Sequence, residues 1–172
     1  QFPGLKLQKQ NNYATRKMRK KELTDGSDYI HIGVEEYLER KGRWEFIWYK
    51  EGEGLDDQGT KETQNYGGAA PELNKTVFIT DPTGLNMLRH WAQKHQEEIV
   101  AIFFNAASDT CHQRMVNERW ETVAQSRTKQ YDLYMQWREL CDYEVDANRW
   151  QEYVAEALYT ILSNEIMAHS VH

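Results

Sequence analysis

The stretch YATRKMRKKELTDGSDY, residues 13–29, gathers five cationic side chains into positions 16–21 and then turns acidic. A turn is expected at Asp25-Gly26, and a strand is expected to start at Tyr29. Arginine forks match phosphate oxygens, and a tyrosine hydroxyl adds a further donor. Arg16, Arg19 and Tyr29 therefore predict an anion site at the mouth of a sheet. A solvated basic turn has the same composition and is the alternative interpretation.

Composition limits the classes of protein to which the chain can belong. Its 172 residues suit a single domain, residues 1–172, and a net charge of −6 argues against a surface that coats nucleic acid. No apolar run is long enough to span a membrane. Cys111 and Cys141 follow no CxxC pattern, and His90 and His95 do not share a helical face. We therefore expect a reduced cytoplasmic protein without a bound metal.

The order of the expected elements indicates an α/β fold with a mostly parallel sheet flanked by helices. Two near-continuous apolar runs, 76–80 and 99–104, are typical of buried strands. Further strands are expected at 5–7, 29–32, 43–50 and 143–146. Helices are expected at 34–42, 69–74, 82–96, 107–118, 121–141 and 150–167. Residues 51–64 are predicted to be a mobile loop and residues 65–68 a turn.

Two more sets of charged residues are candidates for chemistry. Asp81 directly follows an expected strand, where an acid can hold a magnesium ion or a ligand donor; capping of the next helix explains it equally well. Arg114, Arg119 and Arg127 belong to a helix–turn–helix segment that could bring positive charge onto a transferring phosphoryl group. Solvated arginines on polar helices are the alternative.

Several motifs, in this order, resemble those of the guanylate kinases. Residues 15–19 match the family's Thr-Arg-x-x-Arg, and residues 25–29 match its Asp-Gly-x-Asp-Tyr. Supporting matches lie at 65–67 (Asn-Tyr-Tyr-Gly), 81–84 (Asp-x-Gln-Gly) and 142–145 (Tyr-Asp-Tyr-x-x-x-Asn). The resemblance runs from about Phe2 to Leu162, and its first two motifs are the most specific.

The resemblance implies a guanylate kinase-like fold, which is a P-loop kinase fold, here without the first strand, P-loop and helix. It implies a small antiparallel monophosphate-binding subdomain (12–75), a core (76–112 and 142–168) and a helical lid region (113–141). The substrate-binding residues implied are Arg16, Arg19, Tyr29, Tyr66 and Asp81. The lid arginines, which would be catalytic, are Arg114, Arg119 and Arg127.

Departures from the family pattern bear on function. The sequence contains no GxxxxGK[ST] segment, which is the cradle for the phosphates of ATP. Mg²⁺ with ATP is therefore implied only if such a segment precedes Gln1, and otherwise no cofactor is expected. The guanine-contacting Glu of the family falls near Glu45 or Phe46. Its guanine-contacting Ser or Thr is replaced by Gly67 or Gly68.

Two functions are open at this point. The first is binding of a GMP-like nucleoside monophosphate by part of, or a relative of, an ATP-dependent kinase; the chain as given is expected to lack phosphotransfer activity. The second is a catalytically inactive module that binds a partner protein or phosphopeptide with the same arginines. Loss of the first strand would also leave a gap. We expect the sheet to close up, or another protein or a second copy to cover the gap.

Overall fold

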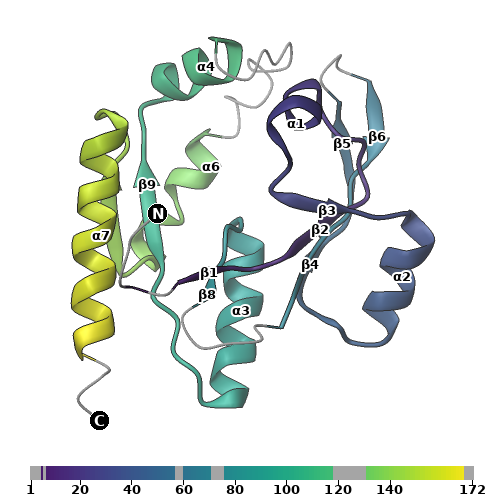
Figure 1. Ribbon diagram of the computed structural model, residues 1–172, viewed down its shortest axis with the longest axis horizontal. Helices are drawn as coiled ribbons and strands as arrows, with labels where there is room; N and C mark the ends of the chain where they lie inside the picture. The colour runs from purple at the N-terminus through teal and green to yellow at the C-terminus, as the bar shows by residue number, and fades with distance from the viewer. Residues whose placement is uncertain (1–4, 6, 57–59, 71–75, 118–130, 169–172) are drawn as a thin grey trace.

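The computed structural model describes residues 5, 7–56, 60–70, 76–117 and 131–168. Helix α3 (Pro82–His95) lies between two groups of strands (Figure 1). One group is a four-stranded sheet, and the other consists of short parallel pairs. Among the described helices, none is both long enough and apolar enough to cross a membrane.

The four-stranded sheet has the strand order β3-β2-β7-β4. β2 runs parallel to β3, whereas β7 is antiparallel to both β2 and β4. The subdomain that was expected to be antiparallel is therefore mixed. The strands are β2 (Asn12–Ala14), β3 (Tyr29–His31), β4 (Phe46–Lys50) and β7 (Tyr66–Ala69).

Strand β7 corrects one prediction, because the sequence at 65–68 indicates a turn and most of these residues are in the strand. Its two glycines let aromatic rings from β4 lie against the backbone. A Cβ atom on Gly67 would come within 2.7 Å of the Phe46 ring. A Cβ atom on Gly68 would come within 2.0 Å of Trp48 Nε1. These glycines therefore serve close packing and not a turn.

Aromatic residues fill both faces of this sheet. On the outer face, α2 (Val34–Gly42), which has the predicted bounds, contributes Tyr37, whose ring lies 5.3 Å from that of Phe46. The ring of Tyr13 lies 5.5 Å from Phe46 on the same face. The register of β4 shifts between Phe46 and Trp48, so Trp48 points to the inner face, which meets α3.

The segment 51–64 also differs from its prediction as a mobile loop. Its described part contains a hairpin of β5 (Glu53–Leu55) and β6 (Lys61–Thr63). The base of the hairpin is closed by a hydrogen bond from Gln64 N to Gly52 O at 2.9 Å. The prediction is wrong because backbone bonds define this hairpin, and its polar strands carry no apolar alternation.

The remaining strands pair in parallel, as the α/β prediction requires. The pairs are β1 (Gln8–Lys9) with β8 (Thr76–Val77), and β9 (Ile102–Asn105) with β10 (Tyr143–Asp146). Among the described residues the two pairs do not join into one sheet, so closure of the gap is not seen there. The strand expected at 5–7 starts later, since Leu5 lies in a bend.

Two strands that were expected to be buried are partly open to solvent. Ile79 is 57% exposed and lies beyond the two-residue strand β8. Phe104 in β9 is 47% exposed. The prediction of buried strands is wrong here because β8 and β9 each have one described partner strand, which leaves apolar side chains uncovered.

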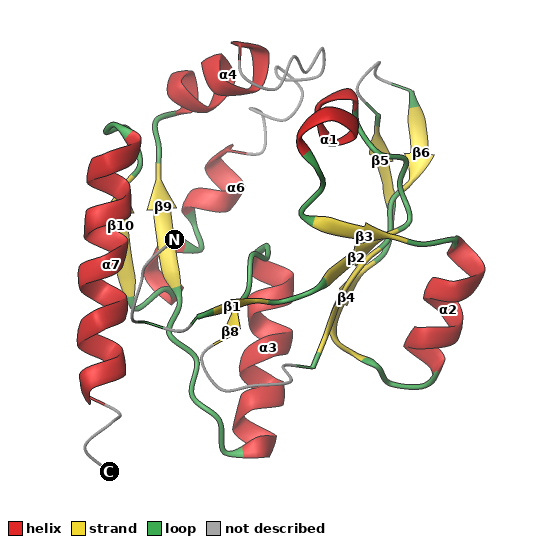
Figure 2. Ribbon diagram, in the orientation of Figure 1, coloured by secondary structure: helices red, strands yellow, loops and turns green. Residues whose placement is uncertain are grey.

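The helices around the parallel pairs follow the sequence signals more closely. Asp81 caps α3, since its Oδ1 accepts a hydrogen bond from Gly84 N at 3.0 Å, and Pro82 is the first helical residue. This confirms the predicted cap. Helix α7 (Gln151–Ala168) lies along β9 and β10 (Figure 2).

The region expected to form a lid is only partly described. Helices α4 (Ser108–Asn117) and α6 (Tyr131–Met135) lie at the same end of the molecule as α1 (Lys20–Asp25) (Figure 1). The long helix expected at 121–141 is not continuous in its described part, because a separate 3₁₀ turn spans Arg138–Leu140. Tightened bonds such as Trp137 N to Tyr134 O, at 3.1 Å, end α6 early. The helix expected at 69–74 falls mostly outside the described residues.

Candidate functional site

The guanidinium of Arg16 is the buried centre of the basic stretch. Arg16 follows β2, and its side chain is 2% exposed. Its Nη2 donates to Glu22 Oε1 at 2.5 Å, and its Nη1 donates to Glu22 Oε2 at 2.7 Å and to Lys17 O at 2.9 Å. Burial opposes the charge, but the hydrogen bonds and the charge of Glu22 outweigh burial and raise the pKa of Arg16. Arg16 is therefore a fixed cation.

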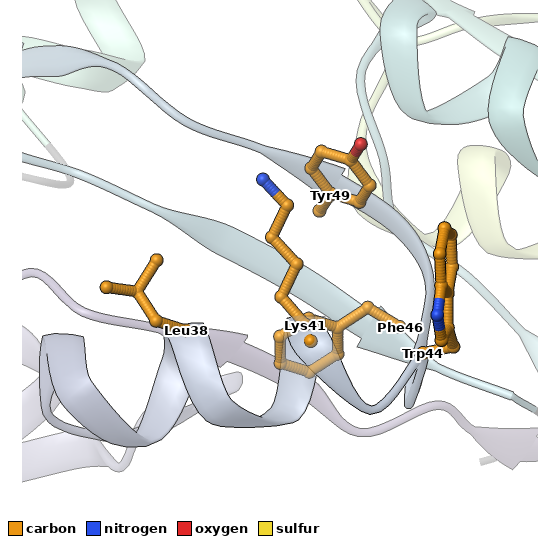
Figure 3. A pocket seen from close by; sticks show the side chains of 6 residues that line it. Leu38, Lys41, Trp44, Phe46 and Tyr49 are labelled. Atoms are coloured by element: carbon orange, nitrogen blue, oxygen red, sulfur yellow. The ribbon is translucent and has the colours of Figure 1, made fainter.

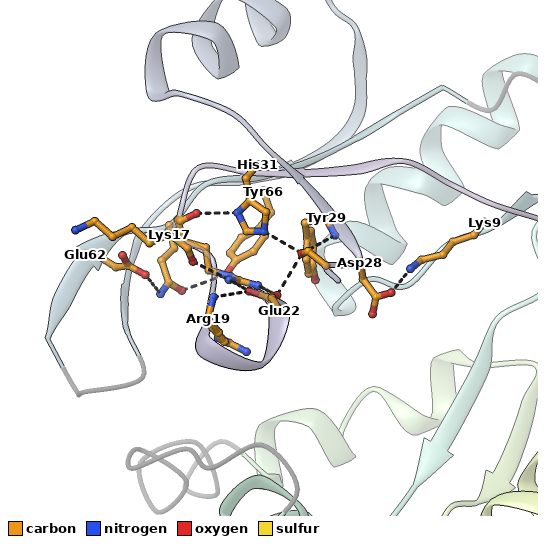
Figure 4. Close-up of polar contacts among 12 residues, drawn as sticks. Lys9, Lys17, Arg19, Glu22, Asp28, Tyr29, His31, Glu62 and Tyr66 are labelled. Atoms are coloured by element: carbon orange, nitrogen blue, oxygen red, sulfur yellow. Dashed lines mark hydrogen bonds and ion pairs between the residues drawn. The ribbon is translucent and has the colours of Figure 1, made fainter. Parts of the chain in front are cut away.

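Glu22 ties the two arginines of the motif together. It lies in the first turn of α1, where a negative charge suits the helix dipole. Besides Arg16, it accepts a hydrogen bond from Arg19 N at 2.7 Å. Burial acts to raise the pKa of Glu22, but the hydrogen bonds from Arg16 and from the Arg19 amide lower it to about 2. The ionised carboxylate thus holds the start of α1 beside Arg16. Figure 4 shows Glu22 next to Arg19.

Two tyrosines complete this cluster. The rings of Tyr29 and Tyr66 lie 5.5 Å apart, and Arg16 Cζ lies 5.4 Å from the centre of the Tyr29 ring. The Tyr66 hydroxyl donates to Gln64 Oε1 at 3.1 Å. Burial raises the pKa of Tyr29, so its hydroxyl stays protonated. The structure thus brings together four residues that the sequence predicts, Arg16, Arg19, Tyr29 and Tyr66, which we call the anion site.

A serine and a histidine that the sequence analysis does not single out fasten the turn before β3. His31 Nδ1 lies 2.9 Å from Arg16 O and must donate to it, because a carbonyl oxygen only accepts. In a neutral ring Nε2 then accepts from Ser27 Oγ, 2.9 Å away. Ser27 Oγ also accepts from Tyr29 N at 3.1 Å. These bonds hold Tyr29 and Arg16 in register.

Asp81 lies near the anion site but is engaged by another residue. Its Oδ2 accepts from Lys50 Nζ at 2.5 Å, while its Oδ1 caps α3 through Gly84 N. Lys50 is the last residue of β4, and its side chain is 49% exposed. This ion pair connects the four-stranded sheet to α3. Asp81 is a candidate from the sequence alone, whereas Lys50 becomes one only through its place in the structure.

Comparison with solved structures identifies the fold in which this arrangement lies. The chain is similar to the crystal structure of guanylate kinase from Anaplasma phagocytophilum, with a TM-score of 0.63 over 95% of this chain and 76% of that chain. The chain has a guanylate kinase-like fold. No protein-family model and no curated protein matches the sequence. At 22% sequence identity the likeness concerns the fold, so the roles of single residues rest on geometry.

Of the three arginines expected in the lid, Arg114 is the one that lies within the described residues. Arg114 lies half-buried in the last turn of α4. Arg119 and Arg127 lie outside the described residues. Their catalytic role therefore stays a prediction, and the site is built from the anion site and the Lys50–Asp81 pair.

A pocket lies on the outer face of the four-stranded sheet, away from the anion site. It is a pocket of about 280 Å³ lined by Leu38, Lys41, Gly42, Trp44, Phe46 and Tyr49 (Figure 3). Lys41 Nζ lies 4.3 Å from the Tyr49 ring centre and 2.7 Å from Glu51 Oε2. Because its lining is mostly apolar and includes a single cation, this pocket is a poorer place for an anion than the anion site.

Proposed function

We propose that this chain binds a nucleoside monophosphate, with GMP as the reference ligand, through the phosphate group at the anion site. The observation that carries the proposal is that Arg16, Tyr29 and Tyr66 lie together beside one four-stranded sheet, with the Arg19 side chain close enough to act electrostatically on Tyr29. Two guanidinium groups and two phenol hydroxyls are donors that suit the oxygens of a phosphate dianion. The guanylate kinase-like fold supports a nucleotide as the ligand.

The hydrogen bonding of Arg16 adds to this support. Its Nε is buried and has no hydrogen-bond partner among the described residues, although both Nη atoms are paired. A buried N–H without a partner costs free energy, and an anion oxygen that reached it would recover that cost. Arg16 thus contributes a fixed positive charge and one N–H group, at Nε, that can still donate to an acceptor.

Binding, and not phosphoryl transfer, is the activity proposed for these 172 residues, because they contain no GxxxxGK[ST] segment. The chain would be part of, or derived from, an ATP-dependent nucleoside monophosphate kinase that acts in the cytoplasm. Mg²⁺ with ATP belongs to the proposal only where a P-loop is supplied by residues beyond this sequence.

Trp48 favours a second candidate, an inactive module that binds a phosphopeptide or another phosphorylated partner. The resemblance places a base-contacting hydroxyl at Gly67 or Gly68, but Trp48 Nε1 lies where a side chain on Gly68 would begin. Glu45 is paired with arginines of the outer face, and Phe46 is buried. In this proposal the phosphate-binding residues are present, while the positions that the resemblance gives to base contacts carry no matching side chain. A partner protein, or a second copy, would also cover the open edges of β8 and β9.

Isothermal titration calorimetry tests the proposal with wild type, Arg19→Ala and the control Arg43→Ala. Arg43 is an exposed arginine on the outer face, paired with Glu39 and Glu45. We expect GMP to bind wild type and the control equally, and to bind Arg19→Ala roughly 10- to 100-fold more weakly, as for one charged hydrogen bond. Absence of GMP binding by wild type, or equal binding by Arg19→Ala, contradicts the proposal. A phosphoserine peptide that binds more tightly than GMP favours the second candidate.

A further inference from the structure

Lys50 shares a face of the sheet with the anion site. In the pairing of β4 with β7, Lys50 lies directly opposite Tyr66. Residues opposite each other in an antiparallel pair send their side chains to the same face. The bulge between Phe46 and Trp48 produces this register. If the same residues continued in the Phe46–Ala69 register with no bulge, Tyr49 would oppose Tyr66 and Lys50 would face the outer side of the sheet.

Asp81 neutralises Lys50 in the unliganded protein. Burial works against the charge on Lys50, but the hydrogen bond and charge of Asp81 outweigh it and raise the pKa of the amine. Tyr134 of α6 and Tyr66 of the anion site are also close enough to act on this amine electrostatically. Lys50 therefore stands between the sheet, the start of α3 and α6.

The two cations of this region differ in their freedom to meet a ligand. Arg16 is 2% exposed and holds Glu22 with both Nη atoms. Lys50 is 49% exposed and has a single described carboxylate partner. An exposed lysine pair contributes little free energy, and the flexible four-carbon stem can swing its ammonium group to a stronger anion. A phosphate group carries up to two negative charges where Asp81 carries one.

We propose that Lys50 is a phosphate-binding residue of the anion site. Without a phosphate group its ammonium group pairs with Asp81, and an arriving phosphate group displaces Asp81 from this pair. This inference rests on the proposed function and adds a fifth residue to the anion site, whose ammonium group is mobile. It also gives Asp81 a role opposite to direct ligand contact, because Asp81 competes with the ligand for Lys50.

The test measures GMP binding by calorimetry for wild type, Lys50→Met, Lys50→Arg, Asp81→Asn and the double variant Lys50→Met/Asp81→Asn. Asn keeps an oxygen that can cap α3. We expect Lys50→Met to bind roughly 10- to 100-fold more weakly, and Lys50→Arg to stay close to wild type. Asp81→Asn should bind up to about fivefold more tightly, as for release of one exposed ion pair.

The double variant separates this mechanism from simple repulsion between Asp81 and the ligand. If Asp81 acts through Lys50, Asp81→Asn has no effect in the Lys50→Met background. Tightening that persists there overturns the inference, as does weaker binding by Asp81→Asn alone. Lys41→Met is the matched control, since Lys41 pairs with Glu51 on the outer face, and its binding should equal wild type. Wild type that binds GMP, with Lys50→Met unchanged, overturns this inference alone; wild type that binds none overturns the proposed function as well.

Discussion

The four-stranded sheet and the parallel strand pairs both contain apolar side chains, but these side chains are buried to different degrees. In the sheet, Tyr37, Phe46 and Trp48 are 0%, 7% and 4% exposed. In the parallel half, Ile79 and Phe104 are 57% and 47% exposed. The sheet has a helix on each face, α2 and α3, whereas β8 and β9 each have one described partner strand. The anion site therefore lies beside the four-stranded sheet, whose apolar side chains are covered by α2 and α3.

Because of this difference, the geometry of the anion site depends on packing in the four-stranded sheet more than on packing in the parallel half. Arg16, Glu22, Tyr29 and Tyr66 contact one another within the first half of the chain. Their geometry depends on packing inside the four-stranded sheet. The parallel half reaches the site through the Lys50–Asp81 pair, in which the side chains are 49% and 19% exposed. Substitutions in the two halves should therefore have unequal consequences.

The largest expected effect is that of Arg16→Ala. It leaves the carboxylate of Glu22 buried without its main partner, and we expect a loss of about 3–5 kcal/mol in the free energy of unfolding. Urea unfolding followed by tryptophan fluorescence measures it. The control Arg149→Ala removes an exposed pair with Asp146 in the parallel half and should cost about 1 kcal/mol or less. Equal losses in the free energy of unfolding for both variants would contradict the expected difference between the two halves.

A smaller effect is expected from Gly68→Ala. The added Cβ would meet Trp48 Nε1 at 2.0 Å, so the tryptophan must shift within a filled face, at a cost of about 1–3 kcal/mol. Gly42→Ala, with no atom within 4 Å of its Cβ and a place in α2, should be neutral or stabilising by about 0.5–1 kcal/mol. Differential scanning calorimetry on both proteins gives the sign of each change. A stabilising Gly68→Ala would show that the inner face has spare room.

The smallest effect is expected for Ile79→Thr in the parallel half. Because Ile79 is 57% exposed, its replacement should change the free energy of unfolding by about 0.5 kcal/mol or less. Sedimentation velocity on the same protein should show weaker self-association if a second copy covers this face. A loss above about 2 kcal/mol would mean that the chain itself buries Ile79 and that the two halves are alike.

The sequence predicts much of the anion site because a local motif encodes it. The spacing from Arg16 to Tyr29 stays within one turn, one short helix and one strand. The predicted cap at Asp81 and the bounds of α2 are local as well, and both are confirmed. Predictions of helix caps and helix bounds are reliable here because neighbouring residues alone determine capping and helix periodicity.

The sequence does not predict which side chains from distant parts of the chain lie side by side. Phe46-Ile-Trp-Tyr-Lys50 contains four consecutive apolar or aromatic residues, so alternation does not tell which of them face α3. Only the register with β7 places Lys50 beside Tyr66. The pairing of Ser27 with His31 across a turn likewise depends on where Arg16 O lies. Exposure of Phe104 depends on what lies beside β9, which an apolar run does not report.

The bulge in β4 also bears on how this site can be kept or lost through changes in chain length. Loss of the codon for Ile47 would remove the extra residue and leave Trp48 opposite Gly68 and Lys50 opposite Tyr66. Loss of the codon for Tyr49 would instead rotate Lys50 to the other side of the sheet, because a one-residue slip reverses the facing of a strand. Within five residues, one position tolerates a deletion and another does not, so a lineage could discard the ammonium group without any amino-acid replacement at position 50.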